Sequence, residues 1–185
     1  HPVQATSIPG VAQRTGATTY YIEIWPKPWP ELGTRTPVMA LNPAVGEIDL
    51  MVASEFLECG RAIQAGFVTP ERTLLVTSNS RVYSTAEKMA MADGRFDLGK
   101  LMGAAESRSR KAVIFDMDQT AKDAGGHISA VMLGAIAGTG LLPVDPEAFR
   151  EGIRAEGKAV DANLRGFDAG LGAVQGKGAP QQRAA

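Results

Sequence analysis

The sequence contains a single cysteine, Cys59, and this scarcity excludes two kinds of structure. One thiol makes no disulfide within the chain, which fits a reducing, cytoplasmic setting. An iron–sulfur cluster is generally held by about four thiolates, so this chain alone holds none. The two histidines, His1 and His127, are far apart in sequence and show no zinc-ligand spacing.

Long apolar runs and an excess of charge are also missing, and aromatic residues are few. No run approaches the roughly 18 apolar residues that cross a bilayer, and no signal peptide is visible at the start. A net charge of −1 gives no indication of a nucleic acid or a membrane surface as partner. With 6% aromatics and 21 glycines among 185 residues, the composition favours one domain of helices packed closely on a sheet.

Apolar runs alternate with helical patterns along the chain. We predict strands at 18–25, 48–55, 73–79 and 111–118. Helical patterns occupy 56–66, 84–92, 97–108 and 127–140, and two more begin at 146 and 160. The segment 25–37 is rich in proline and is predicted to be a loop. This order predicts an α/β fold with a mainly parallel, Rossmann-like sheet flanked by helices, followed by a helical C-terminal extension.

Polar residues follow three of the predicted strands. In open parallel sheets, functional groups gather at the carboxyl ends of the strands. These ends carry Ser54 and Glu55, then Ser78, Asn79 and Ser80, then Asp116, Asp118 and Gln119. Two interpretations stay open: these residues form a binding rim, or they cap helices and meet solvent.

The run VIFDMDQT (113–120) resembles the nucleophile strand of haloacid-dehalogenase-type phosphatases. Such a mechanism would use Asp116 as the nucleophile, with Asp118 beside a bound Mg²⁺. It also needs a downstream cation and a second pair of acids, and no later strand ends in paired acids. The alternative is that Asp116 and Asp118 cap the turn after the strand or line an interface.

A second resemblance covers nearly the whole chain. It is carried by PGVAQRTGATTYYIEIWP (9–26), by the stretch 39–97 that begins MALNPAVGEIDLMVASEF, and by KAVIFDMDQTAKDAGGHISAVMLGAIAG (111–138). The sequence resembles the gamma-type domain of the thiamine-dependent 2-oxoacid:ferredoxin oxidoreductases, and most resembles the beta subunits of the indolepyruvate type. Members begin with an apolar strand, a Gly-Gly-Gln-Gly-type loop and a helix, whereas this sequence starts at what resembles the second strand. We therefore expect an N-terminally truncated gamma-type domain at 1–144, C-terminal helices at 145–175 and a flexible tail at 176–185.

The resemblance implies that the chemistry is divided between subunits. A larger partner subunit would carry thiamine diphosphate, Mg²⁺ and 4Fe–4S clusters and would decarboxylate indolepyruvate and other aryl 2-oxoacids. Coenzyme A would be the co-substrate, and electrons would pass to ferredoxin. This chain would complete a cytoplasmic holoenzyme and hold no cofactor alone. A truncated, non-catalytic remnant is the alternative.

Seven residues are candidates for binding substrate or cofactor: Gln13, Arg14, Thr15, Gly16, Glu55, Ser78 and Asn79. The planar fork of Arg14 suits a carboxylate or phosphate, and Gly16 permits close approach of a ligand or partner backbone. Catalytic residues stay unassigned, and no metal ligand is predicted. Trp25 and Trp29, in the proline-rich segment, are either a lid or subunit contact or ordinary packing residues.

Overall fold

A three-stranded parallel sheet forms the centre of the protein. The computed structural model, which describes residues 1–8, 18–80 and 98–176, orders its strands β3, β4 and β5. Their bounds are Leu50–Ala53, Leu74–Ser78 and Lys111–Phe115. Leu74 pairs with Leu50 on one side and with Lys111 on the other, so β4 is the central strand. The predicted α/β class is confirmed.

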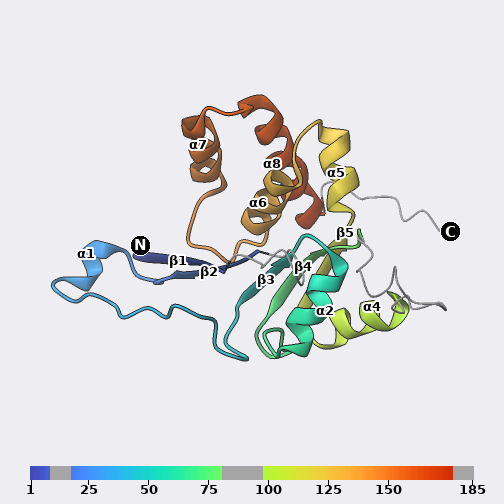
Figure 1. Cartoon of the computed structure of the whole chain (residues 1–185). Helices are drawn as coiled ribbons and strands as arrows, with labels where there is room; N and C mark the ends of the chain where they lie inside the picture. Colours follow the sequence, from blue (N-terminus) through green and yellow to red (C-terminus); the bar gives the residue numbers. More distant parts are fainter. Residues whose placement is uncertain (9–17, 81–97, 177–185) are drawn as a thin grey trace.

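Helices cover both faces of this sheet (Figure 1). On one face lie α2 (Phe56–Gln64) and α4 (Leu98–Ser107). On the other lie α5 (Met117–Ala124), α6 (Ile128–Gly138) and α8 (Val160–Val174), and α7 (Pro146–Glu156) packs outside them. Because both of its faces are covered, β4 is buried along its whole length, which explains why Leu74, Leu75 and Val76 are apolar in succession.

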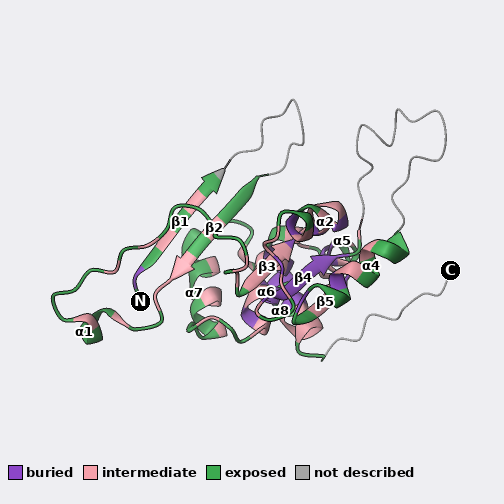
Figure 2. Ribbon diagram, turned by 90° about the horizontal axis from the view of Figure 1, so that it is seen from below, coloured by how far each residue is buried: buried purple, intermediate pink, exposed green. Residues whose placement is uncertain are grey.

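The pleat of β4 divides the core into two clusters. Leu75 faces α2 and α4 and packs with Ala53, Phe56, Cys59, Ala62, Val68 and Ala105. Leu74 and Val76 face the other layer and pack with Phe115, Met117, Ala121, Val131 and Ala135. Figure 2 shows these buried residues concentrated in the sheet and in the helix faces beside it.

Glycine allows α6 and α8 to pack with their backbones almost in contact. A Cβ added at Gly134 would lie 1.9 Å from the carbonyl oxygen of Phe167 in α8. In the other direction, a Cβ at Gly170 would lie 2.0 Å from the carbonyl oxygen of Val131 in α6. Side chains at these positions would force the helices apart, so these glycines, one in each helix, determine how close α6 and α8 lie.

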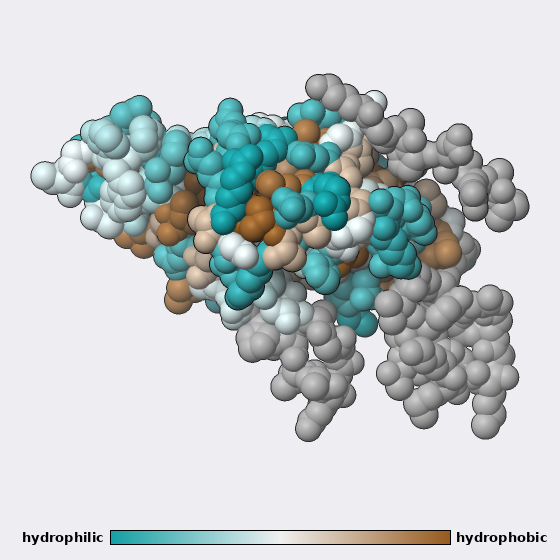
Figure 3. Space-filling model, turned by 90° about the horizontal axis from the view of Figure 1, so that it is seen from above, coloured by the Kyte–Doolittle hydropathy of each residue, from teal (hydrophilic) through white to brown (hydrophobic). Residues whose placement is uncertain are grey.

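Ion pairs hold α7 on the outside of this layer. Arg150 donates to Asp168 of α8 through Nη2 at 2.7 Å and Nε at 3.0 Å, and its guanidinium lies 5.2 Å from the Phe167 ring centroid. Asp145 caps the start of α7 by accepting from the Glu147 amide at 2.7 Å, which confirms the helix start predicted at 146. Figure 3, which views this layer from above, shows a hydrophilic surface interrupted by hydrophobic patches.

The first two strands form a separate antiparallel pair. β1 (Val3–Ile8) pairs with β2 (Thr19–Ile24), and Val3 lies opposite Ile24. The strand predicted at 18–25 is therefore confirmed, but it belongs to this two-stranded sheet and not to the parallel one. The pair extends away from the parallel sheet, as Figures 1 and 2 show.

Two predictions were wrong in part, the loop at 25–37 and the end of the strand at 111–118. The proline-rich segment 25–37 contains a short helix, α1 (Trp29–Leu32), because Pro30 lies in its first turn, where a missing N–H costs nothing. The strand predicted at 111–118 ends at Phe115, and α5 begins at Met117. The helices predicted at 56–66, 97–108, 127–140 and from 160 are confirmed, whereas the one predicted at 84–92 lies outside the described residues.

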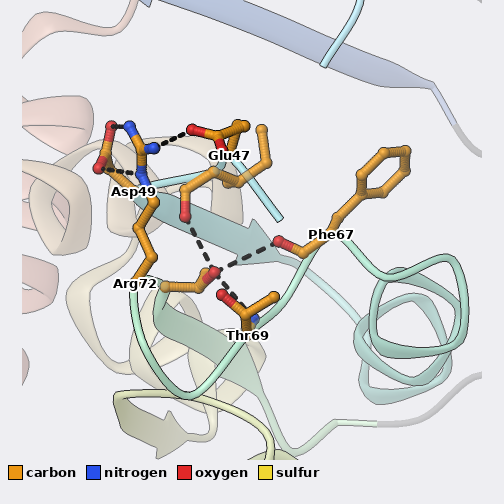
Figure 4. A network of polar contacts seen from close by, with 7 residues as sticks. Glu47, Asp49, Phe67, Thr69 and Arg72 are labelled. Carbon is orange, nitrogen blue, oxygen red and sulfur yellow. Dashed lines mark hydrogen bonds and ion pairs between the residues drawn. The ribbon is translucent and has the colours of Figure 1, made fainter. Parts of the chain in front are cut away.

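A polar network ties together the two loops at the amino ends of β3 and β4 (Figure 4). Arg72 donates to both Glu47 and Asp49. Beneath it, the buried hydroxyl of Thr73 accepts from the Thr69 amide at 3.0 Å and donates to the Ile48 carbonyl at 2.9 Å. This end of the sheet is therefore closed by internal bonds, and the opposite end carries the predicted rim.

Candidate functional site

The carboxyl ends of β3, β4 and β5 lie side by side because the strands are parallel. α2 begins three residues after the end of β3, with Glu55 as its N-cap residue, and α5 begins two residues after the end of β5, with Asp116 as its N-cap residue. Two helix N-termini with partly unsatisfied amides therefore open at one end of the sheet.

Ser78 connects the end of β4 to the start of α5 through buried hydrogen bonds. It is the last residue of β4 and is fully buried. Its hydroxyl accepts from the Met117 amide at 3.1 Å and from the Ser80 amide at 3.2 Å, and it lies 2.7 Å from the Ser80 hydroxyl. Ser78 thus fixes the start of α5 against the end of β4, and its role in a binding site stays a prediction.

Glu55 and Asn79 lie at the surface of the same rim. Asn79 is exposed. Its backbone N–H donates to the Phe115 carbonyl at 3.1 Å, so the side-chain carboxamide takes no part in this bond. Glu55 is partly buried, and its carboxylate makes no capping bond to α2. The first amide of that helix, at Phe56, donates instead to the Ser80 carbonyl at 3.2 Å. A carboxylate and a carboxamide at adjoining strand ends suit a polar ligand with hydrogen-bond donors.

The aspartates of the DMDQT run have structural partners. Asp116 Oδ1 accepts from the Gln119 amide at 2.8 Å, as an N-cap does. Asp118 binds Lys122 at 2.5 Å, one turn along α5, and this hydrogen bond raises the pKa of the lysine. The capping interpretation describes Asp116 correctly, and the structure gives no support to a phosphatase nucleophile. In the described ranges, no group of three His, Cys, Asp or Glu side chains is placed to hold a metal ion.

Cys59 is buried in the core face of α2. Burial raises the pKa of its thiol to about 11, against a smaller opposite effect of a hydrogen bond with Thr77. The thiol is therefore neutral at physiological pH. It is a packing group, as its position on the helix predicts, and a single buried thiol does not fit a cluster or metal site.

The four candidates Gln13, Arg14, Thr15 and Gly16 lie outside the described residues, so their role stays a prediction. The sequence analysis considered Asp116 as a cap but predicted no helix after it, so α5 itself was missed. A signal was present, since Asp116 is followed three residues later by Gln119, a spacing typical of an N-terminal cap. The proposed limits of the domain and its extension also stay predictions.

Comparison with protein families gives one match. A family model described as pyruvate ferredoxin/flavodoxin oxidoreductase matches residues 1–173. The matched segment includes the antiparallel pair, the parallel sheet and nearly all of the C-terminal helices. A comparison with curated proteins found no match. Within the described part of the chain, no helix has the length and apolar character needed to cross a membrane.

Proposed function

The chain belongs to the pyruvate ferredoxin/flavodoxin oxidoreductase family, and from this we propose that it is the beta subunit of a thiamine-dependent indolepyruvate:ferredoxin oxidoreductase. The holoenzyme would convert an aryl 2-oxoacid and coenzyme A to an acyl-CoA and carbon dioxide. Oxidised ferredoxin would accept the electrons released. Membership of the family supports the reaction class, a 2-oxoacid:ferredoxin oxidoreductase. The preference for indolepyruvate is supported by the segments 9–26, 39–97 and 111–138.

The observation that carries this proposal is the extent of the family match. Residues 1–173 cover every element from β1 almost to the end of α8. A match of that length involves the packing of the whole domain, not one short motif. A nucleophile motif such as DMDQT, in contrast, occupies one strand end, where Asp116 caps a helix.

The cofactors are proposed to reside on a larger partner subunit. Thiamine diphosphate supplies the carbanion chemistry of such enzymes, and iron–sulfur clusters carry the electrons. The one thiol of this chain is buried and has a raised pKa, so the chain does not fit an iron–sulfur cluster. No step through a cofactor is therefore assigned to side chains of this chain.

We assign to this chain a role in shaping the substrate or coenzyme A side of the site. Glu55 and Asn79 would present polar side chains at the strand ends, and Ser78 would hold the two adjoining helix starts in place. The segment Gln13, Arg14, Thr15 and Gly16 would bind a carboxylate or phosphate. Each of these roles is a proposal that mutation of the holoenzyme tests.

The test is purification of the tagged full chain from its native host, followed by assay of whatever complex it forms. Thiamine diphosphate and iron are measured in the purified complex, and coenzyme A-dependent reduction of methyl viologen is followed with indolepyruvate, phenylpyruvate and pyruvate. We expect a thiamine- and iron-containing partner, and the highest kcat/KM with indolepyruvate. Recovery of the folded chain without such a partner would refute the proposed function, and a preference for pyruvate would refute the substrate assignment alone. A complex without activity on any 2-oxoacid would favour a non-catalytic remnant.

A further inference from the structure

The N-terminal part of the chain forms an arm that exposes large apolar side chains. We define the arm as residues 1–8 and 18–45, which comprise β1, β2, α1 and the segment that returns to the parallel sheet. In Figure 2 the arm is mostly green, in contrast to the purple central strand β4 of the parallel sheet. Val3, Tyr20 and Ile22 are 58%, 71% and 58% exposed.

These three side chains share one face of the antiparallel pair. Residues directly opposite each other point to the same face, and the pairs are Val3 with Ile24, Ala5 with Ile22 and Ser7 with Tyr20. We call this the outer face. All six of its residues are uncharged, and four of them are Val, Ile or Ala. Its chemistry is therefore that of a surface that packs against another apolar surface.

The opposite, polar face of the pair is covered by the chain itself. Thr6 Oγ1 donates to the Leu41 carbonyl at 2.8 Å, and Gln4 Nε2 donates to the Ala40 carbonyl at 3.4 Å. In return, the Ala40 amide donates to Glu23 Oε2 at 2.6 Å. An isolated amphipathic sheet would normally bury its apolar face and leave its polar face to water. Here the arrangement is reversed.

The covering segment adds a second apolar surface on the other side of the arm. Its backbone faces the pair, while Val38 and Leu41 are 93% and 63% exposed. Since this segment lies on the polar face, these two side chains are on the opposite side from Ile22. The arm therefore exposes apolar groups on both of its sides, which a single flat contact would not cover.

The size of the outer face excludes a simple face-to-face pair of arms as a stable assembly. Two strands of six residues give a face of about 20 Å by 10 Å, on the order of 200 Å². A stable protein interface buries about 800 Å² on each partner. A two-stranded sheet is also only marginally stable in water. A partner that encloses the arm contacts both of its sides, so it covers about twice the area of one face and also supports the two-stranded sheet.

We propose that the arm inserts into an uncharged, apolar cleft of the larger subunit of the oxidoreductase, which contacts the outer face and the Val38–Leu41 side at the same time. The identity of that subunit rests on the proposed function. The two-sided mode of binding rests on the exposure and the hydrogen bonds of the arm. Trp29, at the start of α1 and 53% exposed, is also part of the arm and would be a further subunit contact.

The test places one carboxylate on each side of the arm. Ile22→Asp changes the outer face, Val38→Asp changes the opposite side, and Leu141→Asp changes an exposed apolar residue outside the arm as the control. Each full-length variant is mixed with the purified larger subunit, and Kd is measured by isothermal titration calorimetry. Thermal unfolding of each free variant checks that folding is unaffected, as expected for exposed positions. We expect Ile22→Asp and Val38→Asp each to weaken binding about 100-fold, and Leu141→Asp less than threefold.

The outcomes separate the inference from the proposed function. If the wild-type chain binds a thiamine-bearing subunit and both arm variants bind equally well, the inference fails and the proposed function stands. If only Ile22→Asp weakens binding, the contact is one-sided and the cleft is refuted. If the wild-type chain is dimeric alone by analytical ultracentrifugation and Ile22→Asp makes it monomeric, the occupant is a second copy, which also overturns the proposal. If no larger subunit binds the wild-type chain, both proposals fail.

Discussion

Replacement of Gly170 by alanine tests the close packing of α6 against α8. A Cβ at this position would lie 2.0 Å from the carbonyl oxygen of Val131 and 2.8 Å from its carbonyl carbon. Both atoms belong to the backbone of α6, so no side-chain rotation relieves the overlap. Because real Cβ contacts are essentially never shorter than 3.0 Å, the helices must separate by about 1 Å along this direction.

Two opposing terms determine how much Gly170→Ala changes the free energy of unfolding. Alanine is a better helix former than glycine by about 0.5–1 kcal/mol. Overpacking of a close-packed interior costs about 1–3 kcal/mol, and separation of the helices also loosens the contacts of the buried Phe167. We expect a net loss of about 1–2 kcal/mol in the free energy of unfolding, and a decrease of about 2–8 °C in Tm.

The control is Gly172→Ala, two residues further along the same helix. Nothing lies within 4 Å of a Cβ at Gly172, so alanine should stabilise the chain slightly, by up to about 1 kcal/mol. Urea unfolding of both variants, followed by far-UV circular dichroism, gives the two free energies. If Gly170→Ala is as stable as Gly172→Ala, the backbones of α6 and α8 do not approach as closely as described, and the reasoning is refuted.

Three further measurements test other parts of the molecule. Thr73→Val removes the buried hydroxyl that joins the loops before β3 and β4, and we expect urea unfolding to show a loss of about 1–3 kcal/mol; an unchanged midpoint would contradict this. The pKa of the Cys59 thiol is raised from 9.0 to about 11, so the stability that comes from burying the neutral thiol is present below pH 9.0 and is lost as the pH rises towards 11. Iodoacetamide should therefore label Cys59 at pH 8 far more slowly than a free thiol, and labelling at the rate of the unfolded chain would count against burial. Arg150→Met removes the ion pair between α7 and Asp168 of α8, and amide hydrogen exchange in α7 should accelerate several-fold. Arg154→Met removes a bond within α7 and should accelerate exchange less. Equal acceleration in the two variants would show that the contact to α8 is not what holds α7.

Helices and strands whose limits depend on residues close by in the sequence were predictable. Asp145 followed by Pro146 indicated the start of α7, because a cap and a first-turn proline act within a few residues. The continuous apolar run of β4 indicated a strand covered on both faces, and its burial confirms this. The long segments between residues 9 and 138 indicated the family, which the match over residues 1–173 confirms at the level of the domain.

The ends of elements and the partners of strands were less predictable. Asp116 was compatible with a nucleophile or a cap, and the choice depended on whether the chain after Phe115 turned into a helix. Ser78 was expected at a binding rim, but its hydroxyl bonds the Met117 amide from 39 residues away in sequence. No local pattern reports such a contact, because it exists only when the two strand ends are already side by side.

The residue pattern of this chain was sufficient for its α/β class and the positions of most helices, since capping, periodicity and apolar runs act over a few residues. Its family was indicated by the resemblance of long segments, and the match over residues 1–173 shows it. The tertiary structure alone decided that the strand at 19–24 pairs with β1 outside the parallel sheet. It also decided that the polar side of this pair is covered by residues near Ala40 while Ile22 faces outward. Which face of a two-sided strand is buried depends on what packs against it, and this is a property of distant residues brought together by the fold.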